Sequence, residues 1–267
     1  MANVAAPVKV PVKGTRPDGV ENEADASRKV REMFTQIAPR YDLLNHLLSL
    51  ELDRLWRGRV ARRLRPILQI PDAAVLDLCC GTGDLALSLA REGKARVFGA
   101  DFAHPMLLRA KEKSALIAGN SAEATGKTLP FLEADALRLP LADRSFDLVT
   151  TAFGFRNLAN YEDGLREMQR VLKPGGTIAI LEFTEPPDDF VGNVFRWYYR
   201  NVLPRIGGLI SGDSAAYTYL PKSVARFFRP AELAKLMNSV GFASVDFRVW
   251  TFGTVALHTA VRPRQSP

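Results

Sequence analysis

The stretch AAVLDLCCGTGDLALSLAR, residues 73–91, decides the fold of this chain. Its apolar run over residues 73–79 predicts a buried strand, and Gly81 and Gly83 predict a tight turn directly after it. The apolar positions over Asp84–Arg91 then predict a helix. The turn and the helix start match the G-x-G-x-x-A fingerprint of a nucleotide-binding turn, whose glycines let the backbone approach a ligand closely. We therefore expect a ligand that contains adenosine at the carboxyl end of this strand.

Strands and helices alternate on the C-terminal side of this stretch. Because such alternation is typical of parallel sheets, we expect a doubly wound α/β fold. Two final β-rich runs, Val245–Trp250 and Val255–Val261, predict an antiparallel hairpin. The other predicted strands are 96–100, 131–134, 146–151 and 177–183, the predicted helices are 105–113, 161–172 and 231–241, and residues 173–176 (KPGG) are predicted to form a tight turn.

The chain is predicted to form one domain over residues 28–262. Residues 1–27 mix Pro, Lys, Gly, Asp and Ala without apolar periodicity, so we expect a mobile tail there. Helical periodicity over residues 28–70 predicts an N-terminal extension, whose second helix should cover 41–64 and end before Pro66. A cofactor-binding core is expected over 71–186, an aromatic insertion over 187–230, and a C-terminal helix and hairpin over 231–262.

The composition is that of a globular protein with a sizeable core. Hydrophobic residues make up 47% and charged residues 24% of the 267 residues, which excludes a disordered or fibrous chain. No run reaches the roughly 18 apolar residues of a membrane span, and no secretory signal is visible. The two cysteines, Cys79 and Cys80, are adjacent and provide no disulfide framework, so we expect a cytoplasmic protein. The three histidines are widely separated, and we expect no metal site.

Six of the twelve residues from Arg54 to Arg65 are arginine, in a chain whose formal net charge is +7. This run could meet nucleic acid or an anionic membrane surface. It could also form a solvated helix face, with the arginine stems covering apolar residues beneath them. We favour the solvated face and expect no nucleic-acid partner. Peripheral contact with the inner face of the cell membrane stays open, as does a homodimer.

Three acidic residues lie in or at the ends of predicted strands around the glycine turn. Asp101 follows Gly83 by 18 residues, where a carboxylate can accept hydrogen bonds from ribose hydroxyls. Asp135 and Ala136 end the third predicted strand, where the carboxylate can accept from an adenine amino group. Asp77, inside the first strand, suits the ammonium group of a cationic ligand and would lie poorly beside a pyrophosphate. These positions favour S-adenosylmethionine over a nicotinamide dinucleotide, with an NAD-dependent oxidoreductase as the alternative.

Five segments carry a more specific pattern. They are YDLLN at 41–45 with Ser49 and Trp56, VLDLCCGTGD at 75–84, FGFRN at 153–157, RVLKPGG at 170–176 with Glu182, and YTYLPKS at 217–223. Together they resemble the UbiE/MenG family of S-adenosylmethionine-dependent C-methyltransferases, which act in menaquinone and ubiquinone synthesis. The resemblance covers residues 28–262 and implies the class I methyltransferase fold, which is Rossmann-like.

The resemblance implies transfer of a methyl group from S-adenosylmethionine to a ring carbon of a reduced prenyl quinone. It assigns the cofactor to Gly81, Thr82, Asp101, Asp135 and Ala136, and it makes Arg156 and Asn157 the candidate catalytic residues. Arg156 would stabilise the phenolate oxygen by charge-assisted hydrogen bonds. Because a guanidinium is a poor base, a water held by Asn157 would take the phenolic proton.

The resemblance also suggests roles for residues around the site. Tyr41 and Asp42 are expected in a lid over the cofactor, and the aromatic stretch 190–210 is expected to hold the prenyl tail. His104 is expected to begin a helix near the adenosine.

The chain departs from the family pattern at four positions. Leu44, Asp53 and Thr184 stand where the family usually has methionine, histidine and serine, and Ala152 stands where ubiquinone-type members have serine. The aspartate puts in doubt any catalytic role at position 53. Ala152 and the Cys79–Cys80 pair are similar to menaquinone-only members, so we expect demethylmenaquinol as the substrate, with a polyprenyl benzoquinol as the alternative.

Overall fold

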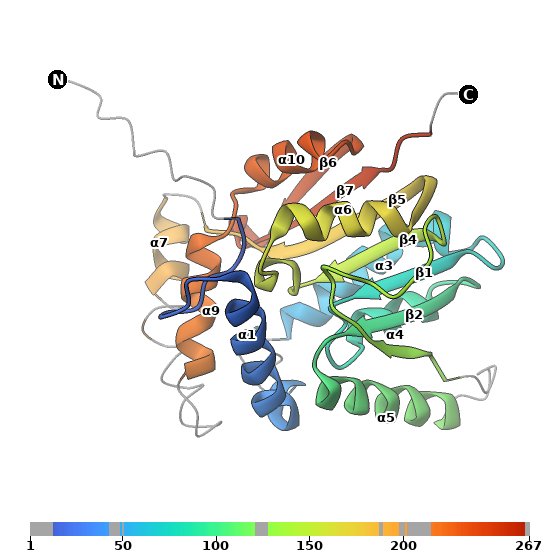
Figure 1. The fold of residues 1–267 in the computed structure, drawn as a ribbon, viewed down its shortest axis with the longest axis horizontal. Coiled ribbons are helices and arrows are strands. Elements are labelled where there is room, and N and C mark those ends of the chain that lie inside the picture. Colours follow the sequence, from blue (N-terminus) through green and yellow to red (C-terminus); the bar gives the residue numbers. More distant parts are fainter. Residues whose placement is uncertain are drawn as a thin grey trace.

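The computed structural model describes residues 13–42, 49, 51–120, 128–186, 189–197, 201 and 215–264, arranged as in Figure 1. Seven strands form one sheet in the order β3-β2-β1-β4-β5-β7-β6. Strands β1 to β5 run parallel, whereas β7 pairs antiparallel with β5 and with β6. This confirms the predicted doubly wound sheet with its C-terminal antiparallel hairpin. The strands are β1 (Ala74–Leu78), β2 (Arg96–Asp101), β3 (Phe131–Glu133), β4 (Phe146–Ala152), β5 (Leu172–Phe183), β6 (Ala243–Trp250) and β7 (Val255–Val261).

Helices cover both faces of the sheet (Figure 1), because the central strands are apolar on both sides. In β1, Leu76 and Leu78 pack into a core with α6 and α10, while Val75 packs into a second core with α3 and α4. The helices are α1 (Glu23–Ile37), α3 (Leu52–Leu68), α4 (Asp84–Arg91), α5 (His104–Asn120), α6 (Tyr161–Val171), α7 (Phe190–Trp197), α9 (Ala215–Arg226) and α10 (Pro230–Ser239), with short 3-10 helices η1 (Ala38–Arg40), η2 (Phe155–Asn157) and η4 (Thr251–Gly253).

The segment before α1 packs against the rest of the domain. The Thr15 amide donates to the Leu158 carbonyl at 2.7 Å, and α1 begins at Glu23. The predicted mobile tail is therefore wrong for residues 13–27, and residues 1–12 lie outside the described part of the chain. Backbone hydrogen bonds to a distant loop leave no pattern in the composition from which the tail was predicted.

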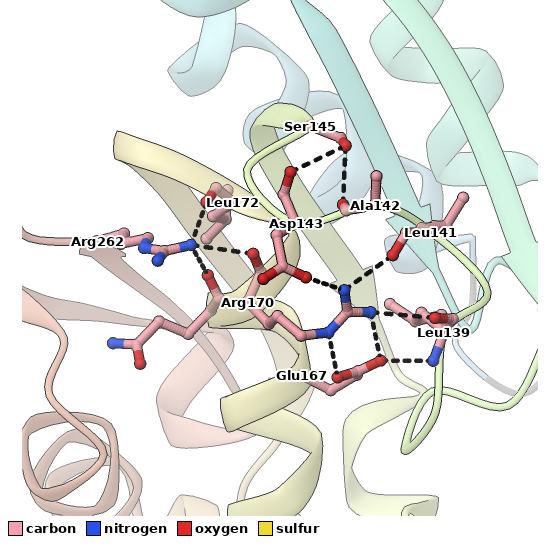
Figure 2. Close-up of polar contacts among 10 residues, drawn as sticks. Leu139, Leu141, Ala142, Asp143, Ser145, Glu167, Arg170, Leu172 and Arg262 are labelled. Carbon is pink, nitrogen blue, oxygen red and sulfur yellow. Dashed lines mark hydrogen bonds and ion pairs between the residues drawn. The ribbon is translucent and has the colours of Figure 1, made fainter.

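The junction between α6 and β5 is held by two arginines, and Figure 2 shows their contacts. Arg170 pairs with Glu167 at 2.8 Å and with Asp143 at 2.5 Å. Arg262, just beyond β7, donates to the carbonyls of Gln169, Arg170 and Leu172. These bonds lie at the amino ends of β4 and β5, so they fix the register of the sheet away from the site.

The predicted tight turn at residues 173–176 is a bulge within β5. Between the paired positions Phe146–Leu172 and Leu148–Thr177, β4 contributes one residue and β5 contributes four. Gly175 in this bulge has a φ of 82°, in the left-handed region that favours glycine. The sequence therefore predicted an irregular backbone here, but the predicted turn is wrong, because pairing with β4 on both sides makes these residues a bulge inside the strand.

Two predicted helical regions differ from the structure. α3 begins at Leu52 and continues past Pro66 to Leu68, while residues 43–48 and 50 of the predicted helix lie outside the described residues. Of the aromatic stretch 190–210, α7 and residue 201 are described and the rest lies outside. Within the described ranges, no helix is long and apolar enough to cross a membrane.

Candidate active site

A cavity lies at the carboxyl ends of β1 and β4, where the order of the strands reverses. Two of the seven predicted site residues, Thr82 and Arg156, lie outside its lining. The five that line the cavity are Gly81, Asp101, Asp135, Ala136 and Asn157.

The glycine turn brings the backbone to this cavity. Gly81 and Gly83 have φ angles of 55° and 85°, and a Cβ on Gly83 would lie 3.1 Å from the Ala110 Cβ. The Asp101 carboxylate holds the turn, because it accepts the amides of Gly81 and Ala103, each at 2.9 Å. Burial raises the pKa of Asp101, although these backbone donors oppose the shift. Asp101 is therefore a buried carboxylate in the cavity wall, with each oxygen bonded to one backbone amide.

Asp77 is a buried carboxylate, and one of its oxygens has no hydrogen-bond partner among the described residues. Its Oδ1 accepts from the Thr150 hydroxyl at 2.8 Å, while its Oδ2 is buried and has no hydrogen-bond partner among the described residues. Burial raises the pKa of Asp77 to about 7, although the Thr150 hydroxyl and the Ala86 amide oppose the shift. A buried acceptor without a donor is destabilising. Asp77 lies outside the cavity lining, next to Leu78, which belongs to it.

An ionic cluster connects the predicted lid to the glycine turn. Tyr41 lines the cavity and lies 3.7 Å from the place of a Cβ on Gly81. The Thr82 hydroxyl donates to the Asp42 carboxylate, and Lys113 Nζ lies 3.0 Å from Asp42 and 3.1 Å from the Thr82 hydroxyl. Thr82 therefore lies beside the cavity, in contact with Asp42. Lys113 gave no signal in the sequence, because only the packing of α5 brings it to the turn.

Arg156 forms a buried ion pair with Glu182 of β5, at 2.8 Å. Its guanidinium also donates to the Phe153 carbonyl and, at 3.3 Å, to the Ser223 hydroxyl of α9. Burial alone would lower the pKa of Arg156, but the charge and hydrogen bond of Glu182, together with Tyr219 and Tyr41, outweigh burial, and the pKa is raised. The guanidinium therefore stays charged, which agrees with its description as a poor base.

Asn157 faces the cavity and is held from behind by a tyrosine. Its Oδ1 accepts from the Tyr219 hydroxyl at 3.0 Å, and that hydroxyl lies 2.8 Å from the Thr15 hydroxyl. Tyr219 belongs to the YTYLPKS segment, and the sequence alone assigns it no role. The link depends on α9 and the segment before α1 meeting behind η2, which no local pattern predicts.

The structure also shows the surroundings of three other residues that the sequence analysis discussed. Ala152 lines the cavity, so the replacement of serine by alanine at this position removes a hydroxyl from the cavity wall. His104 begins α5 and lies 2.9 Å from Glu133, outside the cavity lining. Asp53 is buried in an ion pair with Arg57 of the same helix. Among the described residues, no three His, Cys, Asp or Glu side chains are grouped so that they could hold a metal ion.

Known proteins that resemble this chain in sequence are methyltransferases. The pattern of the ubiE/COQ5 methyltransferase family matches residues 22–262. A demethylmenaquinone methyltransferase of Thermus thermophilus is 51% identical over 232 residues, which cover 86% of this chain and 100% of that protein. One from Deinococcus radiodurans is 47% identical and covers 89% and 94% of the two chains. A ubiquinone/menaquinone biosynthesis C-methyltransferase UbiE of Geobacter sulfurreducens is 41% identical and covers 88% and 89%.

Two solved structures share the fold. An S-adenosylmethionine-dependent methyltransferase of Thermotoga maritima superposes with a TM-score of 0.61 at 19% identity, over 87% of this chain and 99% of that one. The cyclase SpnF superposes with a TM-score of 0.63 at 18% identity, over 89% and 96%. At these identities the likeness concerns the fold alone, and it is the predicted class I methyltransferase fold.

Proposed function

The chain belongs to the ubiE/COQ5 methyltransferase family, and from this premise we propose that it converts demethylmenaquinol to menaquinol, the last step of menaquinone synthesis. It is an S-adenosylmethionine-dependent methyltransferase. The observation that carries the substrate is the 51% identity to a demethylmenaquinone methyltransferase over the whole length of that relative. Methylation of a polyprenyl benzoquinol is the second candidate, because the Geobacter relative is named for both quinones.

The residues of the cavity fit the cofactor. S-adenosylmethionine supplies a methyl group on a positively charged sulfur, which is already activated as a leaving group. We propose that Asp101 accepts from the ribose hydroxyls, that Asp135 and Ala136 meet the adenine, and that Asp77 Oδ2 faces the ammonium group. The support is that the first three line the cavity and that this buried oxygen has no partner in the described part of the protein.

The reaction makes a carbon–carbon bond and needs a nucleophilic ring carbon. That carbon becomes nucleophilic when the neighbouring phenolic hydroxyl loses its proton. The new bond forms as the sulfur–methyl bond breaks, and the displaced ring proton then leaves to solvent. Holding the two reacting carbons in line contributes about 7–11 kcal/mol of the barrier reduction, so a rigid cavity is the main requirement.

Asn157 and Arg156 are the proposed catalytic residues. The Asn157 amide, which lines the cavity, holds the water that takes the phenolic proton. Arg156 stabilises the resulting phenolate. A direct hydrogen bond to that oxygen requires the guanidinium, which lies outside the cavity lining and whose Nη1 donates to the Phe153 carbonyl and Glu182, to turn toward the cavity.

An assay with two quinols tests the substrate. With S-adenosylmethionine and dithionite, we expect methylation of both a naphthoquinol and a benzoquinol of equal prenyl length. The kcat/KM should be higher for the naphthoquinol by a factor on the order of tens, because discrimination by apolar area is worth only about 1–3 kcal/mol. Without a reductant, we expect no turnover of the oxidised quinone, which has no phenolate to activate the carbon.

The two parts of this assay fail separately. A higher kcat/KM for the benzoquinol would reverse the choice of quinone and keep the methyltransferase activity. Full turnover of the oxidised quinone under strictly non-reducing conditions would contradict the phenolate mechanism. Mass spectrometry of the product, with the methyl group of the cofactor deuterated, identifies the methylated ring.

We propose further that α7 and η4 contact the membrane that holds the quinol. Trp197 and Val194 of α7 are 61% and 50% exposed, and Phe252 of η4 is 69% exposed. Because α7 and η4 are in contact, we treat these three exposed side chains as one surface and call it the apolar patch. Phe252 has a φ of 54°, which is strained for a bulky residue. A strained aromatic residue held in solvent suits a surface that inserts into an interface.

Exposed arginines lie next to the apolar patch. The Trp56 indole N–H of α3 donates to the Thr251 hydroxyl of η4 at 2.8 Å, and the exposed Arg59 lies over the Trp250 ring, 6.0 Å from its centroid. Arg57 is buried, but the other five arginines of residues 54–65 are exposed, as predicted for a solvated face. Arginines beside exposed aromatic residues suit anionic lipid headgroups.

Vesicle binding tests this surface. We expect the full chain to co-sediment with vesicles that contain phosphatidylglycerol, and binding to weaken in 0.5 M salt because the arginine contribution is screened. The double variant Trp197→Ser/Phe252→Ser should bind at least about tenfold more weakly, since two large apolar side chains no longer insert. Leu116→Ser, at an equally exposed leucine of α5, is the control. An equal loss in the control, or no loss in the double variant, would contradict the assignment.

A further inference from the structure

A second hollow, separate from the cofactor cavity, lies between the end of β5, α7 and α9. Its only charged side chains among the described residues are Glu185 and Arg196, and the guanidinium of Arg196 donates to the Pro186 carbonyl at 2.9 Å. We call it the apolar groove, because most of its wall is formed by Phe183, Pro186, Leu220, Pro221, Val224 and Ala225.

The inner end of the apolar groove adjoins the cofactor cavity. Phe183, in the groove wall, packs on Phe153, in the cavity wall, with ring centroids 4.5 Å apart. The Arg156 guanidinium lies over the same Phe183 ring, 5.4 Å from its centroid. The Phe153–Phe183 pair, with Arg156 beside it, therefore lies between the groove and the cofactor cavity.

A competing hollow lies on the other side of Asn157, behind Tyr219. It is bounded by the segment before α1, by α1 itself and by α9. Charged side chains surround it, in contrast to the apolar groove. They are Arg16, Asp18, Lys29, Glu32, Lys222 and Arg226. A hydrocarbon chain would leave these charges without water, so this hollow suits it poorly.

We propose that the apolar groove binds the prenyl chain of the substrate beyond its first isoprene unit. The inference rests on the proposed function, in which the acceptor is a prenylated quinol. The ring occupies the cavity beside Asn157, and the chain passes the Phe153–Phe183 pair into the groove. Burial of the chain is favourable in proportion to the apolar area that leaves water. Only the part of the chain beyond the aromatic pair contacts the groove.

Filling each hollow in turn tests this inference. The substrates are two demethylmenaquinols, one with a single isoprene unit and one with four. Ala225→Trp places a large side chain in the apolar groove, and we expect it to lower kcat/KM about tenfold or more for the four-unit quinol and less than about twofold for the one-unit quinol. Met33→Trp fills the charged hollow at a half-buried apolar position and should leave both values near those of the parent protein.

The outcomes separate this inference from the proposed function. Equal losses for the two quinols in Ala225→Trp, or a selective loss for the four-unit quinol in Met33→Trp, would overturn the groove assignment. Turnover of the one-unit quinol by Ala225→Trp shows that this variant folds, and Val224→Phe replaces it if that turnover is absent. If the parent protein methylates neither quinol, the proposed function itself has failed.

Discussion

Replacing Asp77 by asparagine is expected to raise the free energy of unfolding of the ligand-free protein by about 4 kcal/mol at pH 8. The carboxylate is buried, its Oδ2 has no partner in the described structure, and its pKa of about 7 lies about three units above the ordinary value of 3.8. One unit corresponds to about 1.4 kcal/mol. The folded state therefore holds this proton more tightly than the unfolded state, and stability is lost as the pH rises from about 4 through about 7.

The same variant should bind S-adenosylhomocysteine about ten- to a hundredfold more weakly. The reason is that an ion-assisted hydrogen bond to the ammonium group is worth about 1.5–3 kcal/mol. The free energy of unfolding thus rises while the affinity for S-adenosylhomocysteine falls. This is the result expected for a buried charge that destabilises the protein and binds a ligand. Loss of both would instead indicate a purely structural aspartate.

Denaturant unfolding at pH 5 and pH 8 measures the stability effect. The gain in Asp77→Asn should shrink to about 1–2 kcal/mol at pH 5, where most of the folded parent protein carries the proton. His258 acts in the opposite direction, because burial lowers its pKa to about 4 and stability falls as the pH drops below about 6.5. His258 is present in both the parent protein and Asp77→Asn, so its contribution cancels when their free energies of unfolding are subtracted. A gain of equal size at both pH values would contradict the assignment.

Replacing Arg156 by methionine is expected to destabilise the protein by about 3–5 kcal/mol, because it leaves the buried Glu182 carboxylate without its partner. Glu182 also accepts the backbone amides of Arg156 and Phe183, at 3.0 Å and 2.9 Å. The two amides bond to different oxygens of Glu182, so glutamine at position 182 removes the charge and keeps an oxygen for only one of them. The double variant Arg156→Met/Glu182→Gln should therefore regain part of the lost stability.

The double variant separates catalysis from stability. If the Arg156 charge stabilises the phenolate, kcat should stay about 100- to 1,000-fold below that of the parent protein although part of the stability is regained. Glu182→Gln alone keeps the arginine and serves as the matched control, with a much smaller loss of kcat. Recovery of kcat together with stability in the double variant would leave Arg156 only its role in the ion pair.

The local parts of the fold were predictable from the sequence because their causes are local. α4 covers Asp84–Arg91 and β7 covers Val255–Val261, both as predicted, because apolar periodicity alone determines which face each element buries. Gly81 and Gly83 adopt the left-handed angles that the turn requires. The family segments added what periodicity cannot provide, namely the chemistry expected at the carboxyl ends of the strands.

By itself, then, the sequence determined the doubly wound sheet, its antiparallel end, the ligand turn and the family. Only the tertiary structure decided the partners of the polar groups. One oxygen of Asp77 has no hydrogen-bond partner among the described residues, Arg156 is bound to Glu182 outside the cavity lining, and Lys113 contacts Asp42. The physical reason is that turns and periodicity depend on neighbours in the chain, whereas the state of a buried charge depends on groups many residues away. Such contacts follow only from how the helices pack on the sheet.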